Sequence, residues 1–135
     1  RGWQDEPGRD PREYRHIFAT ALAAPEPVDI LLGTWGYLLP KGAFDAAVHD
    51  FSGWPPQVRW VDDIWISGHL ARRGVSRKVV AARSLPIETQ ASDKAALTFG
   101  LNRSGENDRI AIDAFARWWG APASPANDVR EGPSR

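Results

Sequence analysis

The sequence predicts one small α/β domain. A helix with clear start and stop signals is predicted over residues 62–73, and it lies between two short apolar runs, 28–32 and 77–82, that suit buried strands. A helix followed directly by a strand is typical of a layered α/β arrangement. The length of 135 residues is also that of a single domain. We therefore expect a sheet flanked by helices.

The first part of the chain is predicted to be irregular and then helical. Residues 1–12 are polar and contain two prolines, which favours an irregular entry. Residues 13–24 carry apolar side chains at helical spacing, with Asp10 as cap and Pro11 in the first turn. Pro25 ends this predicted helix.

Short elements are predicted to follow. The apolar run 28–32 leads into a tight loop, residues 33–36, and a second short strand is expected over 37–39. A short helix is expected over 43–49, and the proline-rich residues 52–56 form a stiff link to the central helix.

The predicted central helix has a complete set of end signals. Asp62 is expected to cap its first amides, and Asp63 to complement the positive end of the helix dipole. Arg72 and Arg73 complement the other end, and Gly74 suits a left-handed C-terminal cap. One stripe of this helix carries Ile66, Leu70 and Arg73, and the next carries Ile64, Ser67 and Ala71, which predicts a narrow buried side.

The last third predicts a strand, a loop and a helix. Residues 77–82 suit a strand, 84–105 a loop, and 106–119 a final helix capped by Asn107 or Asp108. The residues from Gly120 onward have the composition of a disordered tail. We therefore expect a folded part over 1–120 and a tail over 121–135.

Composition argues against several classes of function. The 17 basic and 17 acidic residues give no net charge, which disfavours a nucleic-acid-binding protein. The absence of cysteine excludes disulfides, thiolate metal sites and cysteine nucleophiles. The sequence contains no apolar run of membrane-spanning length and no signal-peptide pattern, so we expect a cytoplasmic location, or membrane association through other segments or partners. A chain that begins at Arg1 without methionine is expected to be a fragment of a longer reading frame.

Two segments are candidates for a functional site. The adjacent carboxylates Asp62 and Asp63 either act in catalysis or only complement the helix terminus. The second segment is a loop, which either forms a pocket wall or is a simple tight turn. Its residues are Gly33, Thr34, Trp35 and Gly36.

Tryptophan is frequent, with seven residues, and aromatic faces stack on sugar rings. Trp35, Trp54 and Trp65 lie near the loop and the acids, so they are candidate sugar platforms, whereas the two tryptophans of the last helix suit the core. The three histidines fit no metal-binding spacing, and His69 is expected at the surface or behind the site. Ser67 lacks the context of a nucleophile.

Residues 28–44 (VDILLGTWGYLLPKGAF) and 61–70 (VDDIWISGHL) together resemble the C-terminal half of a bacterial glycosyltransferase domain of the GT-A type, similar to family 2. The resemblance implies a partial GT-A fold, with a mixed sheet and flanking helices. It implies that Asp63, or Asp62, is the general base on an acceptor hydroxyl. By the same resemblance the loop at 33–36 lines the donor or acceptor pocket, and Trp65 shapes it.

The resemblance also implies partners that other residues must bind. The nucleotide-sugar donor would be held through Mn or Mg by an upstream Asp-x-Asp motif, and this chain has no such motif after an apolar strand. The nucleotide-binding half is therefore expected to be missing, and the fragment to be inactive alone. Two alternatives stay open: a non-catalytic carbohydrate-binding or interaction module, and, less favoured by the geometry of neighbouring helical residues, a hydrolase with paired acids.

Overall fold

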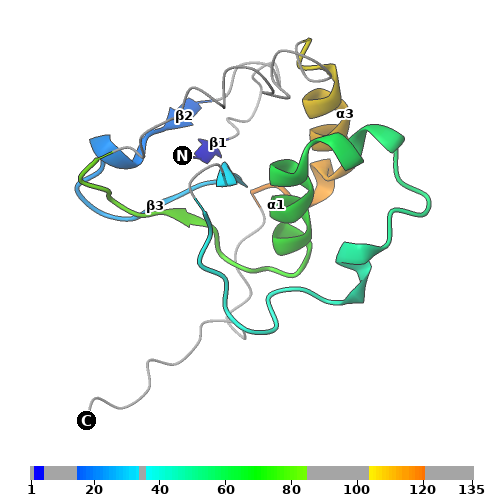
Figure 1. Cartoon of the computed structure of the whole chain (residues 1–135), viewed down its shortest axis with the longest axis horizontal. Helices are drawn as coiled ribbons and strands as arrows, with labels where there is room; N and C mark the ends of the chain where they lie inside the picture. Colours follow the sequence, from blue (N-terminus) through cyan, green and yellow to red (C-terminus); the bar gives the residue numbers. More distant parts are fainter. Residues whose placement is uncertain (1, 5–14, 34–35, 85–103, 121–135) are drawn as a thin grey trace, which may run out of the picture.

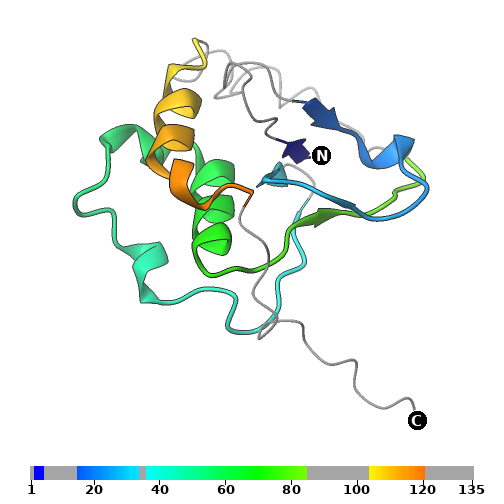
Figure 2. The same cartoon turned by 180° about the vertical axis from the view of Figure 1, so that it is seen from behind.

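The computed structural model describes residues 2–4, 15–33, 36–84 and 104–120. These residues form a small mixed α/β structure with antiparallel strands and two α-helices. The helices α1 (Asp62–Arg72) and α3 (Glu106–Ala114) pack against each other at one end of the molecule, and the strands lie at the other end in both views (Figures 1 and 2). The α/β class expected from the sequence is confirmed at this level.

The strands are short and belong to two sheets. β1 (Gly2–Gln4) lies between β2 (Arg15–Ile17) and β4 (Ile30–Leu31), and β3 (Glu26–Pro27) pairs with β5 (Lys78–Val79). Every pairing among the described residues is antiparallel, so this part of the chain does not show the parallel pairs of a mixed sheet.

α1 begins and ends close to where the sequence predicts. At its end, Gly74 takes a left-handed conformation with φ of 67°. The Gly74 N–H donates to the Ala71 carbonyl and the Val75 N–H to the Leu70 carbonyl, both at 2.9 Å. This pair of bonds is the Schellman motif, which satisfies the last carbonyls of a helix. The glycine after Arg73 therefore has the role that the sequence indicates.

Two other predictions about α1 are wrong. Asp62 is not the cap. The capping position is Val61, no side chain makes a capping hydrogen bond there, and both aspartates lie inside the first turn. The buried side is also broad rather than narrow, because α1 packs on β4, on α3 and on three 3-10 helices at once. Its buried residues are Ile64, Trp65, Ser67, Gly68, His69, Leu70 and Ala71.

The main core lies between α1, α3 and η4 and combines aliphatic side chains with a group of stacked aromatic rings. Phe115, directly after α3, is fully buried and its ring lies against Gly68, where an added Cβ would come within 2.4 Å of the ring. Trp54 stacks on the other side of Phe115 at 4.6 Å between ring centroids, and Trp65 meets Trp54 edge-on at 5.2 Å. Gly68 is thus required for the close approach of the second helix.

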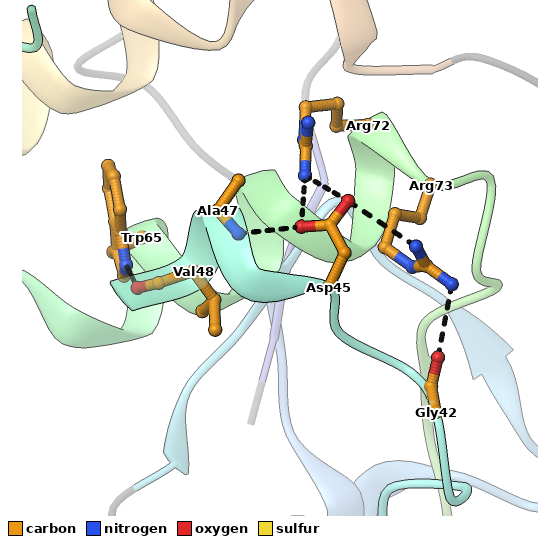
Figure 3. A network of polar contacts seen from close by, with 7 residues as sticks. All are labelled: Gly42, Asp45, Ala47, Val48, Trp65, Arg72 and Arg73. Atoms are coloured by element: carbon orange, nitrogen blue, oxygen red, sulfur yellow. Dashed lines mark hydrogen bonds and ion pairs between the residues drawn. The ribbon is translucent and has the colours of Figure 1, made fainter. Parts of the chain in front are cut away.

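An ion-pair network holds the end of α1 to the chain that precedes it (Figure 3). The Asp45 carboxylate accepts from Arg72 Nη2 at 2.6 Å and from Arg73 Nη1 at 3.4 Å. It also accepts from the Ala47 N–H at 3.1 Å and so caps η3 (Ala46–His49). Slight burial acts against ionisation, but the Ala47 hydrogen bond and the arginine contacts outweigh it and lower the pKa of Asp45. One carboxylate therefore fixes both η3 and the C-terminus of α1.

Arg77 links the two halves of the strand region from a buried position. Its Nε donates to the Asp29 carbonyl at 2.9 Å and its Nη1 to the Val75 carbonyl at 3.0 Å, while the Arg77 carbonyl accepts from the Val28 N–H at 3.0 Å. Burial lowers the pKa of the guanidinium, and the Asp29 charge opposes that effect. The chain after α1 is thereby tied to the link between β3 and β4.

Several expected elements differ in the structure. The helix predicted over 13–24 is wrong in its described part, which forms β2 and the 3-10 helix η1 (Ala19–Ala21). The irregular entry predicted over 1–12 contains β1, because residues 2–4 find partners on two strands that come later in the chain. No strand forms at 37–39, where Tyr37 turns toward α1 instead. In all three cases the local pattern is overridden by contacts with residues that are distant in the sequence. For β1 and β2 these contacts are strand pairs, and for Tyr37 the contact is the hydrogen bond to Asp63.

Other elements are shorter than expected. The strand expected over 28–32 is present only as β4, and the one over 77–82 only as β5. Of the helix expected over 43–49 only η3 forms, and the stiff link is followed by another 3-10 helix, η4 (Pro56–Trp60). Of the loop expected over 84–105, residues 85–103 lie outside the described residues, and so does the tail expected over 121–135.

The last helix is also shorter, and its start differs from the prediction. α3 ends at Ala114 and is followed by η6 (Ala116–Trp118). Its capping position is Gly105, with a left-handed φ of 67°, and the Ser104 hydroxyl accepts from the Glu106 N–H at 3.3 Å. The expected caps Asn107 and Asp108 lie inside the helix, so that prediction is wrong. None of the described helices is both long enough and apolar enough to cross a membrane.

Of the two places expected for His69, at the surface or behind the site, the surface is wrong, because the side chain is buried among aromatic rings. Its side chain is 1% exposed, and the rings of Trp65, Phe115 and Trp54 surround it at 4.3, 5.5 and 6.0 Å between centroids. Neither ring nitrogen has a hydrogen-bond partner among the described residues. Burial, with the nearby Arg72 charge, lowers the pKa of His69 to about 4, and Asp45 opposes this.

We expect Gly68→Ala to lower the free energy of unfolding by about 1–3 kcal/mol, because the new Cβ overlaps the Phe115 ring. Alanine favours a helix by up to about 1 kcal/mol over glycine, which only partly offsets this cost. Urea denaturation measures the change. Phe115→Leu is the matched partner: the double variant should lose less stability than the sum of the two single variants. Strict additivity would contradict the proposed contact.

We expect stability to fall as the pH is lowered from 6.5 toward about 4, because His69 takes up a proton in the unfolded chain before it does so in the folded one. The contribution is complete above pH 6.5 and its loss amounts to up to about 3 kcal/mol. Urea denaturation of the wild type and of His69→Phe across this range isolates the effect. Parallel pH profiles for the two proteins would show that His69 is not the cause.

Candidate functional site

The carboxylate of Asp63 meets the loop that follows β4. The Gly33 N–H donates to Asp63 Oδ1 at 2.9 Å, and the Tyr37 hydroxyl donates to the same oxygen in a short hydrogen bond. Asp63 lies in the first turn of α1, 30 residues after Gly33 in the sequence. The structure therefore joins the two segments that the sequence singled out.

Gly33 is needed for this arrangement because the Tyr37 ring lies directly over its Cα. A Cβ on Gly33 would come within 2.1 Å of the Tyr37 ring and 2.2 Å of its hydroxyl oxygen. The loop closes with a hydrogen bond from the Gly36 N–H to the Gly33 carbonyl at 2.8 Å, and Gly36 has φ of 100°, which disfavours other residues. The two glycines have different roles: one allows close packing and the other allows the turn.

The electrostatics keep Tyr37 protonated. Burial raises the pKa of its phenol, and the hydrogen bond to Asp63, together with the charges of Asp63 and Asp62, raises it further. Tyr37 is therefore a hydrogen-bond donor at neutral pH. α3 brings a third carboxyl group into range: burial raises the pKa of Asp108, and the Asp63 charge adds to the effect.

A second bond between the helix and strand lies one turn further along α1. The Ser67 hydroxyl is fully buried and accepts from the Leu31 N–H at 2.9 Å. Ser67 thus satisfies a backbone donor of β4, which agrees with the expectation that it is not a nucleophile. The two bonds, from Asp63 and from Ser67, fix the end of β4 and the start of the loop on α1.

The tryptophan candidates that the structure describes belong to the core. Trp65 is 4% exposed, stacks on Phe51 at 4.4 Å between centroids, and donates from Nε1 to the Val48 carbonyl at 2.9 Å (Figure 3). Trp54 is half-buried between Phe115 and Trp65. Both side chains therefore pack in the core beside α1. The other two candidates, Thr34 and Trp35, lie outside the described residues.

Asp62 is exposed and lies beside Asp63 without the capping bond that the sequence suggested. Its charge reaches Tyr37, so it adds to the negative potential of the site. Within the described part of the chain, no group of three His, Asp or Glu side chains could hold a metal ion. The expected Mn or Mg was assigned to residues upstream, and the described residues offer no alternative place for it.

A pocket of about 400 Å³ adjoins this carboxylate site, and Tyr37 belongs to both. Its walls come from the end of β4, from the loop and from β5 with the residues after it, and the lining is mainly aliphatic. Its lining includes Leu31, Tyr37, Leu38, Lys78 and Val80.

Sequence reasoning missed two members of this site. Tyr37 was expected in a strand and Asp108 as a helix cap, and neither was considered as a neighbour of Asp63. One signal was present for Tyr37, because a tyrosine directly after a glycine-rich turn has room to fold back over the turn. For Asp108 there was none, since its position follows from the packing of α3 on α1.

Comparison with family models found no match, and neither the curated proteins nor the solved structures gave one.

We expect Tyr37→Phe to lower the free energy of unfolding by about 1.5–3 kcal/mol, because it removes a hydrogen bond to a charged carboxylate. Asp63→Ala should cost more, since it leaves both the Gly33 N–H and the Tyr37 hydroxyl without their acceptor. The exposed neighbour gives the control, Asp62→Ala. Thermal and urea denaturation compare the three variants, and equal losses for the two alanine variants would contradict a specific role of Asp63.

Proposed function

We propose that this chain is the acceptor-side part of a nucleotide-sugar-dependent glycosyltransferase of the GT-A type, with Asp63 as the general base. One observation carries the proposal: the Asp63 carboxylate accepts hydrogen bonds from Gly33 and Tyr37, at the contact between the two segments that resemble this family. A loop and an acidic helix start that are distant in sequence thus form one site.

The geometry suits a positioned base. Both hydrogen bonds go to Oδ1, which fixes the orientation of the carboxylate and leaves Oδ2 without a donor among the described residues. In the proposed reaction Oδ2 takes the proton of the acceptor hydroxyl. The hydroxyl oxygen forms a bond to the anomeric carbon of the donor, and the nucleoside diphosphate leaves with the electrons of the broken bond.

Asp62 is exposed beside Asp63 in the first turn of α1, and its charge reaches Tyr37. We infer that Asp63 acts through its position, and that Asp62 contributes negative potential or an acceptor contact.

The remaining parts of the proposed enzyme are assigned to other residues. The nucleotide-sugar donor and a divalent Mn or Mg belong to a nucleotide-binding half, where a cation would stabilise the diphosphate leaving group. The described residues hold no suitable ligand set, so no step involving the metal is assigned to them. The proposed location is the cytoplasm.

The alternative, a carbohydrate-binding module, depends on exposed aromatic platforms. Of the three tryptophans considered for that role, the structure describes two: Trp65 is buried, and Trp54 is half-buried against other rings. These two give the alternative no support, and the same experiment distinguishes it from the transferase.

We expect Asp63→Asn to reduce kcat for sugar transfer about 10²–10⁴-fold while folding is kept. The asparagine Oδ1 still accepts from Gly33 and Tyr37, but the side chain no longer takes a proton. Asp62→Asn is the matched control and should have a smaller effect. Release of nucleoside diphosphate is measured with a panel of nucleotide sugars, on this chain and on the longest natural polypeptide that contains it. Near-normal kcat for Asp63→Asn would sink the assignment, and sugar binding without any turnover would favour the carbohydrate-binding module.

A further inference from the structure

The pocket beside the site is much less polar than a sugar-binding pocket needs to be. Its walls are formed mainly by alanine, leucine and valine side chains, with Tyr37 at the side that faces Asp63. Among the described residues that line it, Lys78 alone carries a charge. A volume of about 400 Å³ falls within the range of small-molecule sites, which is about 300–1,000 Å³.

Exposed apolar side chains are concentrated at this pocket. Leu38 is 99% exposed and Val80 64% exposed, and both belong to its lining. Phe18, 40% exposed, directly precedes the lining residue Ala19. The fourth large apolar residue that the structure shows as exposed is Trp60 on η4, which is not part of the lining. Apolar surface gathered in this way marks a binding site for an apolar group.

Tyr37 connects the apolar pocket to the carboxylate. Its ring lines the pocket and its hydroxyl donates to Asp63 Oδ1, so the aliphatic wall and the proposed base are separated by one side chain. A ligand whose apolar part fills the pocket therefore meets Tyr37, which is one hydrogen bond away from Asp63.

From this arrangement we propose that the acceptor is an amphiphile: an alkyl chain lies in the pocket, and a hydroxyl-bearing head reaches Asp63. The assignment of the head as a sugar acceptor rests on the proposed transferase function, whereas the alkyl-binding site rests on the pocket alone. Burial of an alkyl chain removes apolar surface of both the ligand and the pocket rim from water, which supplies the affinity.

Binding of n-alkyl β-D-glucosides to the chain tests the pocket directly. Isothermal titration calorimetry is performed with the propyl to octyl compounds, each below its critical micelle concentration. We expect Kd to fall about three- to fourfold per added methylene until the pocket is filled. The double variant Leu38→Ser with Val80→Ser should weaken octyl glucoside binding by at least about tenfold, and both residues are exposed enough for the fold to be kept.

Trp60→Ser is the matched control, since it removes an exposed large apolar side chain away from the pocket, and it should leave binding unchanged. Affinity that does not depend on chain length, or an equal loss in the control and the double variant, would overturn the proposal. Self-association of the chain that the double variant abolishes would also overturn it, because the surface would then be an interface between two copies.

The binding experiment and the transfer experiment can each contradict one proposal without contradicting the other. Chain-length-dependent binding without sugar transfer would keep the amphiphile site and remove the transferase assignment. Transfer to methyl and octyl glucosides at equal kcat/KM would keep the transferase and remove the amphiphilic acceptor. Faster transfer to the octyl compound, lost in the Leu38→Ser, Val80→Ser variant, would support both.

Discussion

The contact between the Asp63 carboxylate and the loop after β4 determines how the strands are placed on α1. Two donors from the loop share one carboxylate oxygen, and one turn later the Ser67 hydroxyl accepts from the last residue of β4. A carboxylate that is half-buried must be hydrogen-bonded to be tolerated, so the loop has little freedom to sit elsewhere. The same constraint places Tyr37 between the base and the pocket.

Burial of α1 on several sides makes that constraint effective. Phe115 fits against Gly68, and Trp65 and His69 fill the space toward the preceding 3-10 helices. At the C-terminus of α1, Asp45 joins Arg72 and Arg73 (Figure 3). A helix fixed along its whole length holds its first turn still, which is the requirement for a positioned carboxylate. The proposed base and the proposed acceptor pocket are therefore both products of how α1 is packed.

The role of the aromatic residues differs from what their number suggests. Many tryptophans in a short chain are compatible with a surface that stacks on sugars, yet Trp54 and Trp65 form the core. The most exposed large apolar side chains are aliphatic instead, and these two, Leu38 and Val80, lie beside the pocket. This distribution moves the expected ligand contact from aromatic stacking toward the burial of an alkyl chain, and it leaves recognition of the polar end to Asp63 and its neighbours.

The sequence by itself determined the features that depend on neighbouring residues: α1 with its Schellman end at Gly74, the glycine turn at Gly36, and the α/β class. It also identified Asp63 and the loop as candidates, but not their contact. Tertiary structure alone decided the rest. β1 forms because distant strands pair with it, His69 is buried because rings from three segments surround it, and Tyr37 reaches Asp63 through a fold of the chain that no local pattern encodes. Local signals report backbone preference, whereas pairing and burial depend on which surfaces meet.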